Sequence, residues 1–316
     1  MKEAIGGYFS LELPRYEEYH SEGVRLNNGR NCLEYLLRCR KPSKIYIPYY
    51  TCEAVLEPIQ RLHIGYQFYH IDLQFEIGED IELSTTEVLL YTNYFGLKQR
   101  YAEQLAQHYG QCLIIDNTQA FFAKPIDGID TFYTCRKFFG VPDGAYLYTD
   151  AQADSKLDQD SSYDRMTALL KRIDLGPEAG YADFSKTEEA MSGLPIRRMS
   201  MLTKRLMQSI NYKQAARQRR NNFEYLHQAL GQSNQLTLTL EPDAVPMIYP
   251  YFSAADGLRE NLIKNKIFVA CYWPNVADWA ESGSIEYQLM QNLTPLPVDQ
   301  RYGEEEMKEI ANMIVT

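Results

Sequence analysis

Between residues 25 and 150, short apolar segments without polar alternation are interleaved with amphipathic segments of helical length. The most continuous apolar segment, residues 112–115, ends in Asp116. Strands that read as unbroken apolar runs are buried on both faces, and parallel strands are joined by crossing helices. The pattern therefore predicts an α/β fold in which helices cover both faces of a mostly parallel sheet.

The same alternation of apolar and amphipathic segments predicts where the strands and helices lie between residues 25 and 150. The expected strands are residues 45–47, 66–71, 88–91, 112–115, 131–134 and 145–148. The expected helices are residues 30–40, 52–62 and 100–109.

The C-terminal part of the chain has a different character. Strands are expected at 236–240, 247–252 and 267–273, and helices at 254–264 and 304–315. At 316 residues the chain is long enough for two domains. We expect a large α/β domain over 1–230, with an N-terminal arm at 1–24 and a long basic helical segment, single or broken, at 195–230. A smaller α+β domain is expected over 231–316.

Composition excludes several classes of protein. Hydrophobic residues make up 45% of the chain and charged residues 23%, which excludes a mainly disordered protein. The net charge of −10 argues against a protein that coats nucleic acid or anionic membrane. No apolar run is long enough to span a membrane, and the six cysteines and five histidines lack metal-ligand spacing. We therefore expect a cytoplasmic protein without a metal site.

Three polar groups fall where the expected strands and helices meet. The turn Asn27-Asn28-Gly29 opens the helix at 30–40, Asp116 ends the most buried strand, and Lys137 follows the strand at 131–134. Taken singly, the first two are ordinary helix caps and the third is an ordinary solvated lysine. Together they form an anion cradle, an acid and a lysine, which are the groups that pyridoxal phosphate requires.

These residues also carry a resemblance to a known family. The chain resembles the sugar aminotransferases of the DegT/DnrJ/StrS family, which are fold-type I pyridoxal-phosphate enzymes. The similar motifs are Asn-Gly-Arg-Asn at 28–31, Ile-Pro-Tyr-Tyr-Thr at 47–51, Asn-Tyr-Phe-Gly at 93–96, Asp-Asn-Thr-Gln-Ala at 116–120, and Lys137 followed by Gly140 and Asp143-Gly144.

The resemblance implies a three-layer large domain, pyridoxal 5'-phosphate as cofactor, and a role for each matching residue. Lys137 would hold the cofactor and move protons, and Asp116 would face its ring nitrogen. Gln119 would bind the ring's phenolic oxygen, while Thr134 would help to hold the phosphate. The full expected cofactor-binding set is Asn28, Gly29, Arg30, Cys52, Asp116, Gln119, Thr134 and Lys137.

One position departs from the family pattern, and another places the chain within the family. Cys52 stands where the family usually has an aromatic residue that stacks on the cofactor, and Tyr50 or Tyr94 is the expected replacement. Lys137 is retained, which argues against the dehydratase branch of the family, where histidine replaces the lysine.

The resemblance implies an aminotransferase that moves an amino group from glutamate to a nucleotide-linked keto-sugar, in amino-sugar or surface-polysaccharide biosynthesis. It also implies a homodimer with shared active sites. The alternative is an inactive descendant that binds the cofactor or a sugar nucleotide as a binding or regulatory protein.

A basic tract stands out in this acidic chain. Residues 191–223 contain no acid and eight basic residues, which leaves 24 basic against 42 acidic residues elsewhere. The tract could be a solvated helix face, or a cleft or subunit interface whose arginines attract a diphosphate. A nucleic-acid surface is the least favoured reading, because no helix-turn-helix domain is appended.

Overall fold

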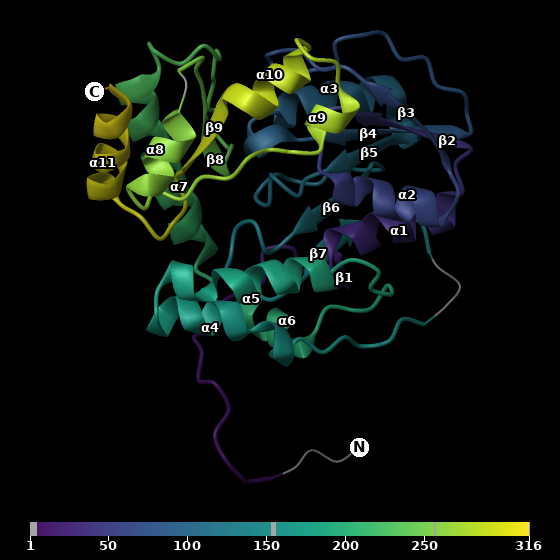
Figure 1. The fold of residues 1–316 in the computed structure, drawn as a ribbon. Helices are drawn as coiled ribbons and strands as arrows, with labels where there is room; N and C mark the ends of the chain where they lie inside the picture. Colours follow the sequence, from purple (N-terminus) through teal and green to yellow (C-terminus); the bar gives the residue numbers. More distant parts are fainter. Residues whose placement is uncertain (1–4, 153–155, 256, 316) are drawn as a thin grey trace.

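The computed structural model describes residues 5–152, 156–255 and 257–315, and its centre is a seven-stranded sheet (Figure 1). Its strand order is β1-β7-β6-β5-β4-β2-β3. The strands are β1 (Val24–Leu26), β2 (Lys44–Pro48), β3 (Gly65–Tyr69), β4 (Glu87–Thr92), β5 (Leu113–Asp116), β6 (Asp130–Thr134) and β7 (Ala145–Tyr148). The five strands from β6 to β3 run parallel, and β7 and β1 add an antiparallel edge. The predicted α/β fold with a mostly parallel sheet is confirmed.

Helices cover both faces of this sheet, so the large part of the molecule has three layers (Figure 1). Helices α1 (Gly29–Arg40) and α2 (Leu56–Arg61) pack on one face, and α3 (Gln99–Tyr109) packs on the other. Successive residues of a strand point to opposite faces. On β2, Ile45 and Ile47 accordingly join the core under α1, whereas Tyr46 joins the core on the α3 side.

The basic segment forms a broken pair of helices. After α4 (Thr167–Asp174) and α5 (Pro177–Ala190), the chain continues as α6 (Met201–Met207) and α7 (Tyr212–Leu230). Ser200 caps α6 by accepting a hydrogen bond from the Thr203 amide, and Asn211 caps α7 by accepting one from the Gln214 amide. Each helix therefore has its own start signal, which explains the break.

We call the elements from β8 to α11 the C-terminal unit. They are β8 (Ile248–Phe252), α8 (Leu258–Lys264), α9 (Val276–Trp279), α10 (Ile285–Asn292), β9 (Leu293–Pro297) and α11 (Glu304–Val315). Strands β8 and β9 form an antiparallel pair, and α7 packs against β8 and α11. Within the described ranges, no helix is long and apolar enough to cross a membrane.

The strand predicted at 236–240 is wrong, since this segment is irregular. The reason lies at the edge of β8. The Asn234 side chain accepts a hydrogen bond from the Phe252 amide (3.0 Å) and donates one to the Pro250 carbonyl (2.8 Å). The Gln235 amide donates a hydrogen bond to the Phe252 carbonyl (3.0 Å). These contacts occupy the backbone groups that a third strand would need.

The strand predicted at 267–273 is also wrong, and β9 takes its place beside β8. Ile267 and Val269 pack on the core of the C-terminal unit. Trp273 instead packs edge-on against Tyr50, with 5.0 Å between ring centroids. The segment therefore crosses between two cores and does not lie along one sheet.

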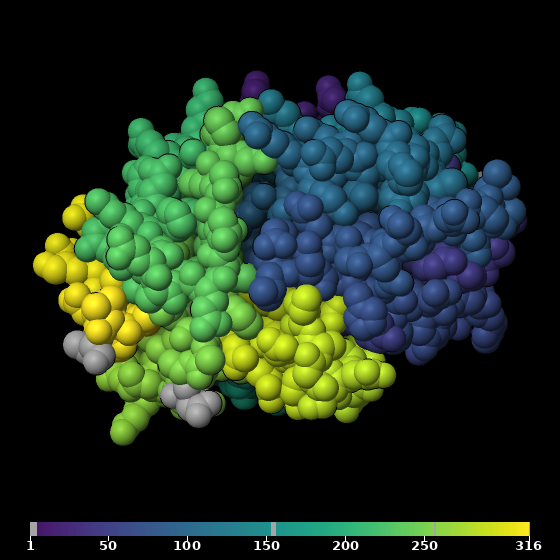
Figure 2. Space-filling model, turned by 90° about the horizontal axis from the view of Figure 1, so that it is seen from above, coloured from purple at the N-terminus to yellow at the C-terminus, as the bar shows by residue number. Residues whose placement is uncertain are grey.

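The C-terminal part of the chain lies directly against the large sheet. Figure 2 shows its green and yellow surface in contact with the blue face formed by the chain up to α3. At this junction the Met247 amide donates a hydrogen bond to the Phe95 carbonyl (2.8 Å). Gly96 makes the approach possible, because its φ is +74° and a Cβ there would lie 2.8 Å from the Val245 carbonyl oxygen.

Candidate functional site

The candidate site lies at the carboxyl ends of β4, β5 and β6, which the parallel pairing brings to one edge of the sheet. Asp116 ends β5, and its carbonyl accepts a hydrogen bond from the Asn93 amide just beyond β4 (3.0 Å). On the other side, the Asn117 amide donates to the Phe132 carbonyl of β6 (2.8 Å). The residues that follow β5 are therefore held by strands on both sides.

Asp116 is a buried carboxylate, 5% exposed. One of its oxygens accepts a hydrogen bond from the Thr118 amide (2.8 Å). Burial raises the pKa of Asp116, while the Lys137 ammonium and the Thr118 donors lower it. A further positive group placed beside this carboxylate would favour its ionised form.

Lys137 is an exposed residue on the turn that follows β6. Its Nζ donates a hydrogen bond to the Thr118 hydroxyl (3.2 Å), so Thr118 contacts both predicted catalytic residues. The turn itself is formed by the Phe138 and Phe139 amides, which both donate to the Cys135 carbonyl (3.2 and 3.0 Å). The structure thus brings Asp116 and Lys137 to one place, although 20 residues of sequence separate them.

Gln119 is fully buried beside the same turn. Its Oε1 accepts a hydrogen bond from the Phe95 amide (3.0 Å), and its Nε2 has no partner among the described residues. A buried amide nitrogen without an acceptor costs free energy unless a ligand or water supplies one. Gln119 therefore has a donor available for a bound group.

The start of α1 packs against the Asp116–Thr118 turn. A Cβ at Gly29 would lie 3.4 Å from the Thr118 methyl group, which is van der Waals contact distance. The side-chain oxygen of Asn28, Oδ1, caps α1 by accepting a hydrogen bond from the Asn31 amide (2.8 Å). The Asn28 Nδ2 is buried and has no partner in the described part of the chain, which leaves a second donor for an anion.

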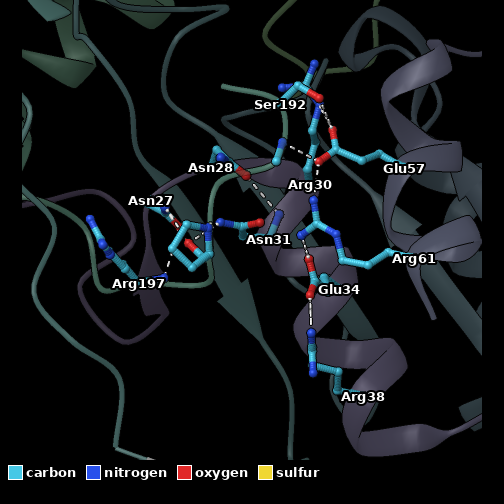
Figure 3. A network of polar contacts seen from close by, with 12 residues as sticks. Asn27, Asn28, Arg30, Asn31, Glu34, Arg38, Glu57, Arg61, Ser192 and Arg197 are labelled. Atoms are coloured by element: carbon cyan, nitrogen blue, oxygen red, sulfur yellow. Dashed lines mark hydrogen bonds and ion pairs between the residues drawn. The ribbon is translucent and has the colours of Figure 1, made fainter. Parts of the chain in front are cut away.

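Figure 3 shows a polar network around this helix start. The Arg30 Nε lies 3.3 Å from a Glu57 oxygen. Glu57 also accepts hydrogen bonds from Arg61 (2.6 Å), the Ser192 hydroxyl (3.1 Å) and the Gly193 amide (2.7 Å). Arg30, expected in the cofactor-binding set, is thus partly neutralised by Glu57, a residue that sequence reasoning missed.

Asn27 was predicted only as part of the turn that opens α1 and was not in the expected cofactor-binding set. It is 1% exposed, and its Oδ1 accepts from the Asn31 side chain (2.8 Å) and the Arg197 amide (3.3 Å). The backbone carbonyl of Asn27 accepts a hydrogen bond from the Gly144 amide (2.7 Å). The Gly144 carbonyl in turn accepts one from the amide of Cys135, which belongs to the turn that carries Lys137 (3.0 Å). Asn27 therefore connects the start of α1 to the Lys137 turn. The Asn27-Asn28-Gly29 sequence signalled a turn but not these partners.

The remaining predicted residues lie around the cluster with less defined contacts. Thr134 is 9% exposed, and its hydroxyl is 3.5 Å from the Gly144 carbonyl. Cys52 is half-buried just before a short 3-10 turn. Tyr50 and Tyr94 are both 0% exposed, and the Tyr94 hydroxyl donates to the Tyr50 carbonyl (2.8 Å). Neither ring offers a free face, so the expectation that one of them replaces the stacking aromatic is wrong for this structure.

Two arginines of the basic tract do not lie on the solvated surface that its charge suggested, although Arg198, Lys213 and Arg217 are exposed. Arg219 is 1% exposed and binds backbone carbonyls, and Arg220 donates to the carbonyls of Glu241 and Ala244. The expectations of a solvated face and of a phosphate-attracting surface are both wrong for these two arginines. A helical pattern cannot distinguish an arginine that faces water from one that satisfies carbonyls of another segment.

Two cavities lie away from this cluster. One, of about 390 Å³, is beside β1 and α6, and the other, of about 820 Å³, lies between α5 and the C-terminal unit. Neither is lined by Asp116, Gln119 or Lys137. The Lys137 side chain, by contrast, is exposed at the surface of the single chain.

No protein-family profile matches the sequence, and no curated protein sequence is significantly similar to it. Solved structures are similar in fold. S. venezuelae DesV superposes with a TM-score of 0.64 at 14% identity, covering 92% of this chain and 83% of that one. A DegT/DnrJ/EryC1/StrS aminotransferase from Brucella abortus gives 0.59 at 15% identity, covering 92% and 84%.

A third similar structure is the E. coli GDP-4-keto-6-deoxy-D-mannose-3-dehydratase with bound hydrated pyridoxal phosphate. Its TM-score is 0.62 at 14% identity, covering 92% of this chain and 87% of that one. The chain therefore has the fold of the DegT/DnrJ/EryC1/StrS aminotransferases.

Proposed function

We propose that this protein is a pyridoxal-phosphate-dependent sugar aminotransferase. The observation that carries the proposal is the meeting of Asp116, Thr118 and Lys137 at the carboxyl ends of the parallel strands. Acid and lysine come from separate segments and lie at the edge where open α/β sheets bind ligands. The solved structures with the same fold support the choice of cofactor, because one of them contains pyridoxal phosphate.

The residues present fit this cofactor. The Asp116 carboxylate suits a protonated ring nitrogen, which would offset the burial that raises its pKa. The free Nε2 of Gln119 suits the phenolic oxygen of the ring. The Asn28 Nδ2 and the backbone amides at the start of α1 suit the phosphate. Thr134 and Cys52 remain proposed contacts.

When bound, the cofactor supplies an electron sink that stabilises negative charge on the substrate carbon. The protein's own residues then have two tasks. The Lys137 Nζ would hold the cofactor covalently and, once released from it, would move a proton to and from the reacting carbon. Thr118 accepts a hydrogen bond from this Nζ and thereby fixes where the amine stands relative to Asp116.

The proposed acceptor is a nucleotide-linked keto-sugar, as in amino-sugar or surface-polysaccharide biosynthesis, and the proposed donor is glutamate. The acceptor class is supported by the similar dehydratase, whose name gives a GDP-linked keto-sugar as its substrate. The donor rests on the family resemblance alone. Retention of Lys137 supports amino transfer over dehydration.

A homodimer with shared active sites is the proposed assembly. The exposed Lys137 side chain supports it, because a second copy could cover it. The N-terminal arm also supports it, since residues 5–12 run away from the body (Figure 1). On this arm Ile5, Tyr8 and Phe9 are 94, 99 and 91% exposed, and such side chains favour burial against a partner.

Two further expectations stay proposals. We place the domain boundary after Leu230, where α7 ends. Along α7, Ala215 belongs to the core of the large sheet, whereas Phe223 and Leu226 belong to the core of the C-terminal unit.

A cytoplasmic location is supported by the six cysteines, none of which is paired in a disulfide.

Two measurements test the proposed function. Purified protein incubated with pyridoxal phosphate should gain visible absorption, and Lys137→Ala should lack it. Adding glutamate should then shift this absorption as the amino group is transferred, and a keto-sugar nucleotide should reverse the shift. A protein that stays colourless contradicts the cofactor assignment. A coloured protein that reacts with no amino donor would instead be the binding or regulatory protein.

A further inference from the structure

Arg219, on α7, is the largest side chain that the structure buries almost completely, at 1% exposed. Its guanidinium makes four hydrogen bonds. It donates to the Gln300 Oε1 (2.7 Å) and to the carbonyls of Pro246 (3.2 Å), Met247 (3.0 Å) and Phe138 (3.2 Å). It also stacks on the Phe138 ring at 4.5 Å from the centroid. Three separate segments of the chain therefore meet at one side chain.

This cation is neutralised by backbone dipoles and not by an acid. No carboxylate lies within ion-pair distance of Arg219 in the described part of the chain, and the neighbouring Asp299 pairs with Arg301 (2.7 Å). Burial lowers the pKa of Arg219 to about 10, and the Asp299 charge opposes this shift. The guanidinium therefore stays protonated at neutral pH. A buried charge held only by carbonyls is costly, and its presence calls for a role.

The Phe138 carbonyl links Arg219 to the proposed cofactor lysine. Phe138 directly follows Lys137, and its carbonyl accepts hydrogen bonds from both Arg219 (3.2 Å) and the Gln300 Nε2 (2.8 Å). Its amide donates to the Cys135 carbonyl (3.2 Å) within the turn. The peptide between Phe138 and Phe139, one residue beyond Lys137, is thus anchored from outside the turn, whereas the lysine side chain itself is exposed.

A second path leads from Arg219 to Gln119. The Met247 carbonyl accepts from Arg219 (3.0 Å), and the Met247 amide donates to the Phe95 carbonyl (2.8 Å). The Phe95 amide in turn donates to the Gln119 Oε1 (3.0 Å). One arginine thereby connects the turn that carries Lys137 with the turn that orients Gln119.

We propose that Arg219 is a positioning residue of the candidate site: it fixes the backbone of the Lys137 turn and ties it to the segment that supports Gln119. The inference rests on the proposed function for the meaning of Lys137, but the restraint on the turn is a property of the cofactor-free protein. A planar guanidinium with five donors can bind three carbonyls and an amide oxygen at once, which a lysine cannot.

Arg220 offers a matched control on the same helix. It donates to the carbonyls of Glu241 and Ala244 and pairs with Glu224, but it does not contact the Lys137 turn. Arg219→Met and Arg220→Met therefore both remove an arginine that binds backbone carbonyls. Only the first removes a contact to the lysine turn, so a merely structural loss is measured by the second.

The first experiment is hydrogen exchange by mass spectrometry on the cofactor-free protein. Exchange in peptides that cover residues 134–140 should be roughly 10-fold faster in Arg219→Met than in wild type, since hydrogen bonds to a charged group are lost. Arg220→Met should leave these peptides unchanged. Equal acceleration in both variants, or none in Arg219→Met, overturns the inference.

The second experiment measures the lysine itself. Borohydride trapping of pyridoxal phosphate at Lys137 should be slowed by roughly 10-fold or more in Arg219→Met and partly restored in Arg219→Lys. Faster exchange combined with an unchanged trapping rate overturns the inference. If wild type does not trap the cofactor at Lys137, the proposed function fails, and the exchange experiment still decides whether Arg219 restrains the turn.

A third variant tests the anchoring even if Arg219→Met does not fold. Gln300→Leu removes the other donor to the Phe138 carbonyl (2.8 Å) and also the Gln300 acceptor of Arg219 (2.7 Å), yet leaves the buried charge in place. We expect exchange at 134–140 to lie between wild type and Arg219→Met. Exchange indistinguishable from wild type in Gln300→Leu would contradict the proposed anchoring.

Discussion

The candidate site has two sides that differ in how they are built. Its floor, formed by Asp116, Asn117 and Gln119, is at most 5% exposed and is held by strands β4 and β6. Its rim, formed by Arg30, Cys52 and Lys137, is partly or largely exposed. The comparison indicates that the groups suited to tune a ring belong to the protein core, while the group suited to attach it stands at the surface.

This difference has an energetic consequence. A floor residue is bound up with the packing of the chain, so a substitution that changes the packing or the hydrogen bonds there should change the stability of the cofactor-free protein. A rim residue has few contacts to lose, so its substitution should change ligand binding alone. The predictions below test this division, beginning with the largest expected effect.

Gly96→Ala should cost about 4 kcal/mol of unfolding free energy, because it combines strain at φ +74° with a Cβ 2.8 Å from the Val245 carbonyl. This glycine lies next to Phe95, which orients Gln119 in the floor. Urea denaturation gives the comparison. Gly140→Ala is the control, since its Cβ would meet nothing within 4 Å. Equal losses in the two variants would show that the close approach at Gly96 is not required.

His20 packs against aromatic rings on β6 and β7, the two strands that follow β5 and the floor in the sheet. Its ring lies 4.1 Å from the Tyr133 ring, its Nε2 is 2.7 Å from the Phe121 carbonyl, and its Nδ1 is 3.1 Å from the Tyr148 hydroxyl. Burial lowers the pKa of His20 to about 4, although the Phe121 carbonyl and Glu18 raise it. The ring is therefore neutral in the folded protein.

The sign of the pH effect follows from this depressed pKa. Between pH 4 and the ordinary value of 6.5, the unfolded chain binds more protons than the folded one. The stability due to neutral His20 is complete above pH 6.5 and is lost as pH falls toward 4, by about 3 kcal/mol. His20→Gln should flatten this part of the pH–stability curve. A curve that keeps the wild-type slope would contradict the assignment.

Asp143 affects the pH dependence of the unfolding free energy in the opposite direction to His20. Burial raises its pKa to about 6, while the Thr203 hydroxyl and Arg165 lower it. Its folded pKa lies above the unfolded one, so this stability is present below pH 3.8 and is lost as pH rises toward 6. Asp143→Asn is therefore the companion variant, and it should steepen the acid-side loss that His20→Gln flattens.

Asp116→Asn should separate stability from function within the floor. Burial raises the pKa of Asp116, so the folded cofactor-free protein carries a penalty for its charge that grows as pH rises above 3.8. The asparagine keeps an acceptor for the Thr118 amide. Unfolding free energy at pH 7 should stay equal or rise by about 1 kcal/mol, while cofactor affinity falls at least 10-fold. Unfolding and equilibrium titration with pyridoxal phosphate measure the two quantities. A large stability loss would contradict the predicted charge penalty.

Lys137→Ala should change the stability of the cofactor-free protein least, by about 0.5 kcal/mol or less, because the side chain is exposed and loses one hydrogen bond to Thr118. Denaturation of the cofactor-free protein measures this effect. A loss as large as that expected for Gly96→Ala would remove the distinction between floor and rim.

The parts of the site that could be predicted from the sequence are those governed by local pattern and topology. The apolar run that ends in Asp116 marks a strand buried on both faces, and parallel pairing then brings its end close to Lys137. The hydrogen-bond partners of Arg219 and Asn27 could not be predicted from sequence patterns, because they lie far away in sequence. The Phe138 carbonyl bound by Arg219 is 81 residues from it.

The failures in the C-terminal unit have the same physical origin. The alternating residues at 236–240 satisfy the strand pattern, but Asn234 and Gln235 already occupy the edge of β8. Hydrogen-bond competition of this kind depends on a side chain outside the predicted strand. Periodicity identifies which residues face a core, and it does not show which backbone groups remain unpaired.

Borohydride reduction of the protein with pyridoxal phosphate, followed by peptide mass spectrometry, tests the central claim most directly. We predict that the phosphopyridoxyl group appears on Lys137 at a stoichiometry near one per chain. Lys137→Ala should lose this label, and Asp116→Asn should carry it only at higher cofactor concentration. Label spread over other lysines at the same level in wild type and Lys137→Ala would contradict the account.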